Sequence, residues 1–366
     1  MNYTNSKPLL LITINLIIAL LTSCSSSNIP TVDISDLEDN ECQVEASQLY
    51  KSIDKIQLET TDSCLLSNPS VVYFGDDGIL VWDNNIVYRF DKSGHFLNKI
   101  GKIGHGCGEF VASVSANYNN KRGIILFGTN SNEVYKYSVD GTYLGKFAVS
   151  GDDNVLMTSK WSESLGEYVC EIRHYRNDGL DVSLSTWDIN GKKLGTYPVY
   201  SDDEVAENNF THTGSLCDTD GGMLFRLPFC ETVYKLTKNG VEETLAFDLG
   251  SHSATREMVE DCAKADLYEK ECYNIFNWSV TPEHIYLCVA CNRGTRDVLI
   301  NREDNSIIHN QFYGVDESNC HIKIDNSGNT FWPWIAKGNK VADFIESRDK
   351  TKNPILVIAT EKATNK

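Results

Sequence analysis

The densest group of residues that could do chemistry lies in residues 101–110, GKIGHGCGEF. Its glycines could cradle a phosphate, and His105 and Cys107 could ligate a metal. A dinucleotide fingerprint needs G-x-G-x-x-G between a strand and a helix, but Glu109 stands in the place of the third glycine and a strand pattern follows. We therefore interpret this run as a sharp crossing between strands, and keep His105 and Glu109 as candidate binding residues.

The second chemical pattern is a pair of cysteines, Cys288 and Cys291, separated as in C-x-x-C metal and redox motifs. Residues 285–291 form a strand pattern, in which a separation of three places the two thiols on opposite faces. No second Cys or His pair at zinc spacing accompanies them, and the eight histidines are scattered. The sequence therefore predicts no metal site and no cofactor.

No catalytic residue can be assigned from the sequence. A G-x-S-x-G nucleophile elbow is absent. The carboxylate pairs at 76–77 and 202–203 lie in polar turn segments, where such pairs usually serve local hydrogen bonding.

Tryptophans offer a different kind of site. Trp278, Trp332 and Trp334 occur in the last third of the chain, and Trp161 lies near its middle. An exposed indole could stack on a sugar ring or grip a peptide. The alternative is that these large rings fill the core, as most tryptophans do. We keep Trp278, Trp332 and Trp334 as candidate binding residues.

The N-terminus has the pattern of an export signal. An apolar run over residues 9–21 is too short for a comfortable membrane span and ends in Leu-Thr-Ser-Cys24. This resembles a bacterial lipobox, so Cys24 is the predicted lipidated N-terminus after removal of residues 1–23. The alternative is an ordinary secretory signal with a chance cysteine. Residues 24–52 are polar and acidic and are predicted to form a flexible tether.

Charge and cysteine content exclude several classes of protein. The net charge is −18, which argues against nucleic acid as a partner and against electrostatic binding to an anionic membrane. The chain has 12 cysteines, of which 11 remain if Cys24 is lipidated, and an odd number at irregular spacing does not indicate a disulfide framework.

The elements that must position these residues come from an internal repeat. A strand, a polar turn and a second strand recur five times, with turn residues at intervals of mostly about 50 residues. These turn residues are Gly94, Gly141, Gly191, Gly240 and Asn305. Another apolar strand and a weaker one precede each hairpin, which gives four antiparallel strands per unit, the dimensions of a β-propeller blade. The sequence therefore predicts an all-β protein.

Closure of the ring is predicted from the two ends of the chain. Residues 320–328, 329–338 and 353–360 supply a sixth set of strands without an outer one, and residues 53–59 alternate like a strand without a blade. We expect the N-terminal strand to complete the last blade of a six-bladed propeller over residues 53–362. Residues 253–272 have helical composition and are predicted to form an insertion between the fourth and fifth blades.

The chain resembles the six-bladed β-propeller lipoproteins of Bacteroidetes, related in layout to NHL-repeat and TolB-like propellers. The likeness lies in IQLETTDSCLLS (56–67), VYRFDKSGHFLNKIGKIGHGCGEF (87–110) and VYKYSVDGTYLGKF (134–147). The sequence departs from the pattern of that group at Gln57 and Cys107, where proline is usual. The resemblance implies the fold more than an activity.

These observations predict a lipid-anchored propeller in the bacterial envelope, at the outer membrane and facing the periplasm. The predicted function is non-catalytic binding of a protein, peptide or glycan ligand. The alternative is a lyase or hydrolase acting on a sugar or peptide at the axial funnel, where distant residues, including ligands for a metal, could converge.

Overall fold

The computed structural model describes residues 29–151, 154–176, 179–202, 215–227, 230–254, 272–291, 294–314 and 321–363. Cys24, the predicted signal peptide and residues 255–271 of the predicted helical insertion lie outside the described residues. Within the described parts, no helix is long and apolar enough to cross a membrane.

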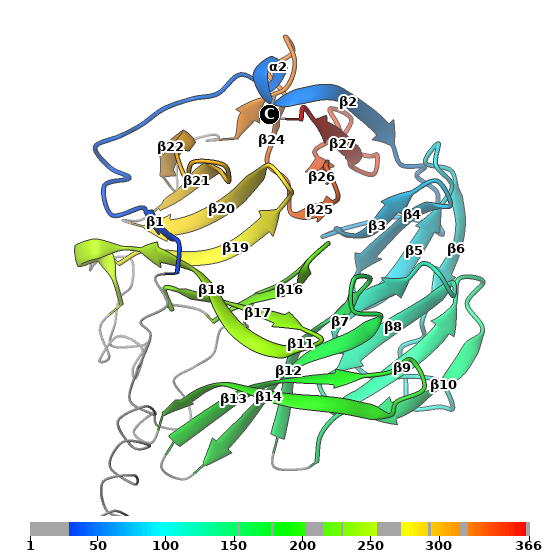
Figure 1. Cartoon of the computed structure of the whole chain (residues 1–366). Helices are drawn as coiled ribbons and strands as arrows, with labels where there is room; N and C mark the ends of the chain where they lie inside the picture. Colours follow the sequence, from blue (N-terminus) through cyan, green and yellow to red (C-terminus); the bar gives the residue numbers. More distant parts are fainter. Residues whose placement is uncertain are drawn as a thin grey trace, which may run out of the picture. The chain divides into compact units, whose positions relative to one another are not determined.

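Six antiparallel blades of four strands each are arranged around a common axis, as the repeat predicts, and one further strand extends the fourth blade (Figure 1). Blade 1 contains β3 (Ser70–Gly75), β4 (Gly78–Asp83), β5 (Ile86–Phe90) and β6 (Phe96–Ile100). Blade 2 contains β7 (Ser113–Asn119), β8 (Ile124–Thr129), β9 (Glu133–Ser138) and β10 (Tyr143–Ala148). Blade 3 contains β11 (Asn154–Ser162), β12 (Glu167–Arg176), β13 (Gly179–Trp187) and β14 (Lys193–Asp202).

The second half of the ring follows the same order. Blade 4 contains β15 (Ser215–Thr219), β16 (Gly222–Arg226), β17 (Thr232–Thr237) and β18 (Gly240–Asp248), followed by the 3₁₀ turn η1 (Gly250–His252). Blade 5 contains β19 (Asn274–Val280), β20 (His284–Cys291), β21 (Gly294–Asn301) and β22 (Ile307–Gly314). Blade 6 contains β25 (Ile335–Lys337), β26 (Lys340–Ile345), β27 (Ile355–Glu361) and β2 (Tyr50–Gln57).

The first strand of each blade lies at the axis, and the fourth lies at the rim. Neighbouring inner strands contact one another around the ring from β3 to β25, and β26 contacts β3 to complete it. The predicted closure is confirmed, because β2 pairs antiparallel with β27 from Tyr50–Glu361 to Gln57–Ile355. The two ends of the chain thus share one blade and remove an open sheet edge.

The sixth blade differs in detail from the predicted set of strands. The sequence predicts two of its strands within residues 320–338, but Ile322–Lys323 (β23) and Thr330–Phe331 (β24) form a separate two-stranded hairpin. The blade begins at β25, and the segment that the sequence did not reveal is β26. Polar residues flank β26 and Asp343 interrupts it, which obscured its apolar pattern.

The hydrophobic core consists of clusters between adjacent blades. One cluster joins each neighbouring pair, including blades 6 and 1 through Leu356, Ala342 and Phe74. The inner faces of two sheets bury their side chains against each other at every interface, so no blade has to fold alone. This packing explains why a repeat of weakly amphipathic strands makes a stable ring.

Residues 31–49, predicted as part of a flexible tether, instead lie along the outside of blades 4 and 5. Residues Thr31–Asp33 (β1) extend blade 4 by pairing parallel with β18. The side chains of Val32, Ile34 and Leu37 are each only 1% exposed. A short helix, α2 (Ala46–Leu49), then leads into β2. The alternation of Val32 and Ile34 was a strand signal that the acidic composition concealed.

Candidate binding cavity at the propeller axis

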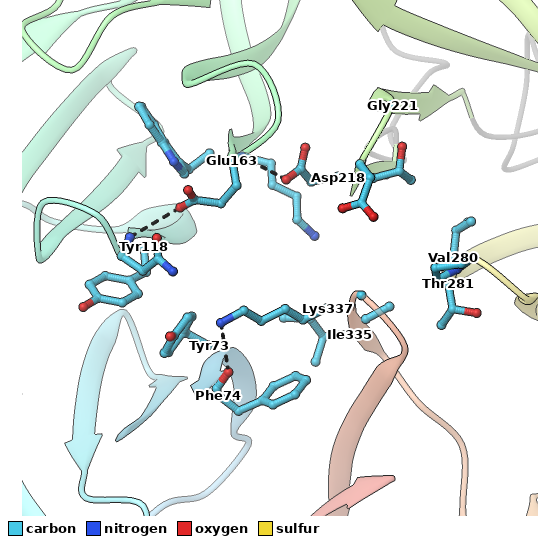
Figure 2. A pocket seen from close by; sticks show the side chains of 18 of the residues that line it. Tyr73, Phe74, Tyr118, Glu163, Asp218, Gly221, Val280, Thr281, Ile335 and Lys337 are labelled. Carbon is cyan, nitrogen blue, oxygen red and sulfur yellow. Dashed lines mark hydrogen bonds between the residues drawn. The ribbon is translucent and has the colours of Figure 1, made fainter. Parts of the chain in front are cut away.

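The inner strands of all six blades surround a cavity of about 640 Å³. Its wall is built mainly where each inner strand ends and turns into the second strand (Figure 2). The lining residues from blades 1 to 3 are Val72, Tyr73, Phe74, Tyr118, Asn120, Lys121, Lys160, Trp161 and Glu163. Those from blades 4 to 6 are Asp218, Thr219, Asp220, Gly221, Lys235, Val280, Thr281, Pro282, Arg302, Ile335, Ala336, Lys337 and Gly338.

One side of the wall is fixed by aromatic and charged side chains from blades 6, 1 and 2. The ammonium of Lys337 lies 4.0 Å from the centroid of the Tyr73 ring and donates to the carbonyl of Phe74 at 3.4 Å. Burial lowers the pKa of Lys337, and the nearby Asp77 carboxylate opposes that shift. Asp77 accepts hydrogen bonds from the hydroxyls of Tyr73 at 2.6 Å and Tyr118 at 2.9 Å. These contacts hold three blades together at the cavity.

The carboxylates on the opposite side join blade 2 to blade 3 and blade 3 to blade 4. Glu163 Oε1 accepts a hydrogen bond from Asn120 N at 3.4 Å, and Glu163 N donates to Asp218 Oδ2 at 2.9 Å. Asp218 Oδ1 also accepts from the hydroxyls of Ser162 at 2.6 Å and Ser164 at 3.1 Å. The acidic part of the wall is therefore preorganised by donors from its own chain.

Basic groups complete the cavity. Arg302 is held through its Nη1, which donates to the carbonyls of Thr281 at 2.5 Å and Pro282 at 3.3 Å. Lys160 and Lys235 extend from β11 and β17. Among the described residues, no carboxylate lies within 4.0 Å of the ammonium of either lysine.

The sequence patterns point to only one residue of this wall, Trp161, and give it no role. The usable signal was positional, because polar or glycine residues such as Glu163, Asp220 and Gly338 follow the first strand of a repeat. Because the inner strands of a propeller surround its axis, the ends of all six inner strands meet there.

The predicted site residues lie in different places. Trp278 is 5% exposed and packs in the cluster between blades 4 and 5, and Trp332 is 2% exposed between blades 5 and 6. Their burial agrees with the alternative interpretation that these large rings fill the core. Trp334 is 51% exposed, and its ring centroid lies 6.4 Å from that of Phe276. Trp334 precedes the cavity residue Ile335 but does not line the cavity, so its binding role stays a prediction.

The glycine-rich run forms the crossing from blade 1 to blade 2, as its composition predicts. Glu109 Oε2 accepts a hydrogen bond from Gly106 N at 2.9 Å and packs against Gly104. His105 is exposed on the same loop. Neither His105 nor Glu109 lines the axial cavity. The structure therefore gives Glu109 a role in shaping the loop.

The two cysteines of the C-x-x-C pair lie on opposite faces of β20, as predicted. Cys288 packs between blades 5 and 6, whereas Cys291 packs between blades 4 and 5. Burial raises the pKa of the Cys291 thiol to about 11. In the described parts of the chain, no group of three potential metal ligands converges.

Comparisons with known proteins agree with this architecture. An exported protein from Bacteroides fragilis superposes with a TM-score of 0.67 at 16% identity, covering 91% of this chain and 100% of the other. A member of the duf4221 family from Bacteroides vulgatus superposes with a TM-score of 0.52 at 10% identity, covering 89% and 100%. These likenesses show a shared fold. No curated protein matches the chain significantly. A family model described as "Domain of unknown function (DUF4934)" matches residues 29–362, and the chain therefore belongs to this family.

Proposed function

We propose that this protein is a non-catalytic binding module that holds a small ligand in the axial cavity. The observation that carries this proposal is the convergence of all six blades on one space of about 640 Å³. Volumes of this size are typical of sites for small molecules, which combine apolar walls with a few fixed polar groups. A ring of packed blades keeps such a site open without requiring the ligand to order it.

The hydrogen bonds at the wall support binding. Glu163 and Asp218 accept hydrogen bonds that fix the positions of their carboxylates. Tyr73 and Tyr118 are likewise fixed by Asp77. Groups held in this way can select a ligand by shape and charge at a low cost in conformational entropy.

We further propose that the propeller is a lipoprotein, with Cys24 as its lipidated N-terminus, at the outer membrane and facing the periplasm. The lipobox-like Leu-Thr-Ser-Cys24 supports this anchor, as does the resemblance to envelope lipoproteins. The similar exported protein from Bacteroides fragilis agrees with an envelope location. Globomycin, which blocks lipoprotein processing, should cause accumulation of the precursor, and unchanged maturation would contradict the assignment.

The binding proposal is tested by filling the cavity. In Gly221→Trp the new side chain starts 3.0 Å from Lys235 Nζ, the movable end of a flexible chain, so the fold should tolerate it. The control is Gly151→Trp, whose Cβ meets nothing within 4 Å and which does not line the cavity. Thermal-shift assays would use neutral and charged disaccharides and tripeptides at millimolar concentration. At least one should raise the Tm of the wild type and of Gly151→Trp but not of Gly221→Trp.

A further inference from the structure

The charge of the cavity wall is opposite in sign to that of the protein. The chain carries a net charge of −18, yet five basic residues and three acidic residues line the cavity. The basic ones are Lys121, Lys160, Lys235, Arg302 and Lys337, and the acidic ones are Glu163, Asp218 and Asp220. The lining residues thus have two more basic than acidic groups, although Asp77 next to Lys337 offsets part of this excess. A local excess of positive charge inside an acidic protein favours an anionic ligand.

Two of the three acidic groups already have partners in the wall. Asp218 accepts three hydrogen bonds from Ser162, Glu163 and Ser164 at 2.6–3.1 Å. Glu163 accepts from Asn120 N, and its Oε2 lies 3.7 Å from the ammonium of Lys121. The Asp218 carboxylate is therefore largely satisfied within the wall, and Lys121 offsets part of the charge of Glu163.

The basic groups, by contrast, retain unused donors. Lys160 and Lys235 have no ion-pair partner within 4.0 Å among the described residues. Lys337 makes one long hydrogen bond to a carbonyl and rests on a tyrosine ring, which leaves other N–H donors of its ammonium. Arg302 is anchored through Nη1 alone in the described structure, so its Nη2 and Nε remain.

We propose that the axial cavity binds a small organic anion of about disaccharide or tripeptide size through carboxylate oxygens. Lys160, Lys235 and Lys337 would supply the charge, while apolar residues such as Phe74, Val280 and Ile335 would contact its uncharged part. This inference rests on the proposed binding function and specifies its ligand class. The same basic side chains would recognise the carboxylate of an acidic sugar and that of an acidic peptide.

Matched pairs of probes separate charge from shape. Isothermal titration calorimetry would compare digalacturonate with neutral galactobiose, and Glu-Ala-Glu with Gln-Ala-Gln, with Lys-Ala-Lys as the cationic probe. The acidic member of at least one pair should bind about tenfold tighter than its neutral match, since a hydrogen bond to a charged group contributes roughly 1.5–3 kcal/mol. Added salt should weaken the binding of the acidic probe. A preference for the acidic member of the sugar pair would indicate an acidic sugar as the ligand, and a preference within the peptide pair would indicate an acidic peptide.

The double variant Lys160→Gln, Lys235→Gln should lose about tenfold or more in affinity for the acidic probe. Lys92→Gln, on the exposed β5–β6 turn, removes a lysine far from the cavity wall and should bind like the wild type. Near-UV circular dichroism and Tm would confirm that the double variant is folded. If it is not, the single variants Lys160→Gln and Lys235→Gln carry the same test.

Three results would overturn the inference: equal affinity for a neutral match, preference for Lys-Ala-Lys, or no binding of any acidic probe at millimolar concentration. Tight binding of a neutral probe that Gly221→Trp abolishes would refute the anion assignment while supporting the binding function. If no member of the wider panel distinguishes wild type from Gly221→Trp, the proposed function itself fails.

Discussion

The backbone of Gly94 lies directly against that of Gln57. Gly94 O accepts a hydrogen bond from Glu59 N at 2.8 Å, and a Cβ added to Gly94 would lie 2.5 Å from Gln57 O. Gly94 turns the outer hairpin of blade 1, and Gln57 ends the strand that closes blade 6. The turn glycine of one blade thus touches the outer strand of the preceding blade. Gly141 and Gly191 make the same kind of approach to Lys99 and Phe147.

We expect Gly94→Ala to destabilise the protein by about 2–4 kcal/mol, since a positive-φ penalty adds to a clash with backbone that cannot rotate away. The matched control is Gly240→Ala at the equivalent turn of blade 4, where φ is also positive but the new Cβ meets nothing within 4 Å. That variant carries the positive-φ penalty without the clash and should therefore cost less than Gly94→Ala. Urea unfolding measures both values, and equal costs would show that the contact with Gln57 has no effect.

A second prediction concerns Asn353, which is 1% exposed and joins blade 6 to the segment before blade 1. Its Oδ1 accepts from Leu66 N at 2.8 Å, and its Nδ2 donates to Glu59 O at 2.7 Å and Cys64 O at 2.9 Å. Asn353→Ala leaves these buried backbone groups without partners and should cost about 3 kcal/mol. Asn98→Ala serves as the control: Asn98 is half-buried on β6 and its Nδ2 donates to Val139 O at 3.1 Å, so its loss exposes fewer unsatisfied groups and should cost well under half as much.

A third prediction concerns the segment that lies outside blades 4 and 5. Asn310 is fully buried, and its Nδ2 donates to Leu37 O at 2.6 Å and Asn40 O at 3.0 Å. Its backbone also exchanges hydrogen bonds with Cys42. Asn310→Ala should increase hydrogen exchange in residues 36–45 more than in β20 and β21. Uniform acceleration across blade 5 would instead indicate that Asn310 supports the whole blade.

The fourth prediction is a pH dependence from Asp343 on β26. Burial raises the pKa of Asp343 to about 7, although a backbone hydrogen bond from Phe344 and the nearby His321 oppose the shift. Since the folded pKa exceeds the unfolded value near 4, the folded state binds the extra proton between pH 4 and 7. The contribution of Asp343 to stability is therefore present below pH 4 and lost as pH rises to 7.

Asp343→Asn mimics the protonated carboxyl and should remove this part of the pH dependence. Unfolding free energies would be measured from pH 4.5 to 8 for both proteins. Asp297, His321 and Cys288 also face this region, so the quantity that matters is the difference between variant and wild type. The variant should gain relative stability as pH rises. A difference that stays constant with pH would contradict the raised pKa.

The sequence by itself determined the number and order of the blades, because strand alternation and turn glycines are local signals. It also placed the N-terminal strand in the last blade, because that strand has no blade of its own and the last blade lacks an outer strand. The crossing at Gly104–Gly108 and the opposite faces of Cys288 and Cys291 followed from the same local geometry.

Only the tertiary structure decided where function could lie. The cavity brings together Tyr73, Lys160, Asp218 and Lys337 from four blades, and no local pattern relates these positions to one another. The packing of Val32 and Ile34 on the outside of the ring was hidden for a similar reason, because their partners are distant in sequence. Strand periodicity is set by neighbouring residues, whereas a binding site depends on which strand ends meet at the axis.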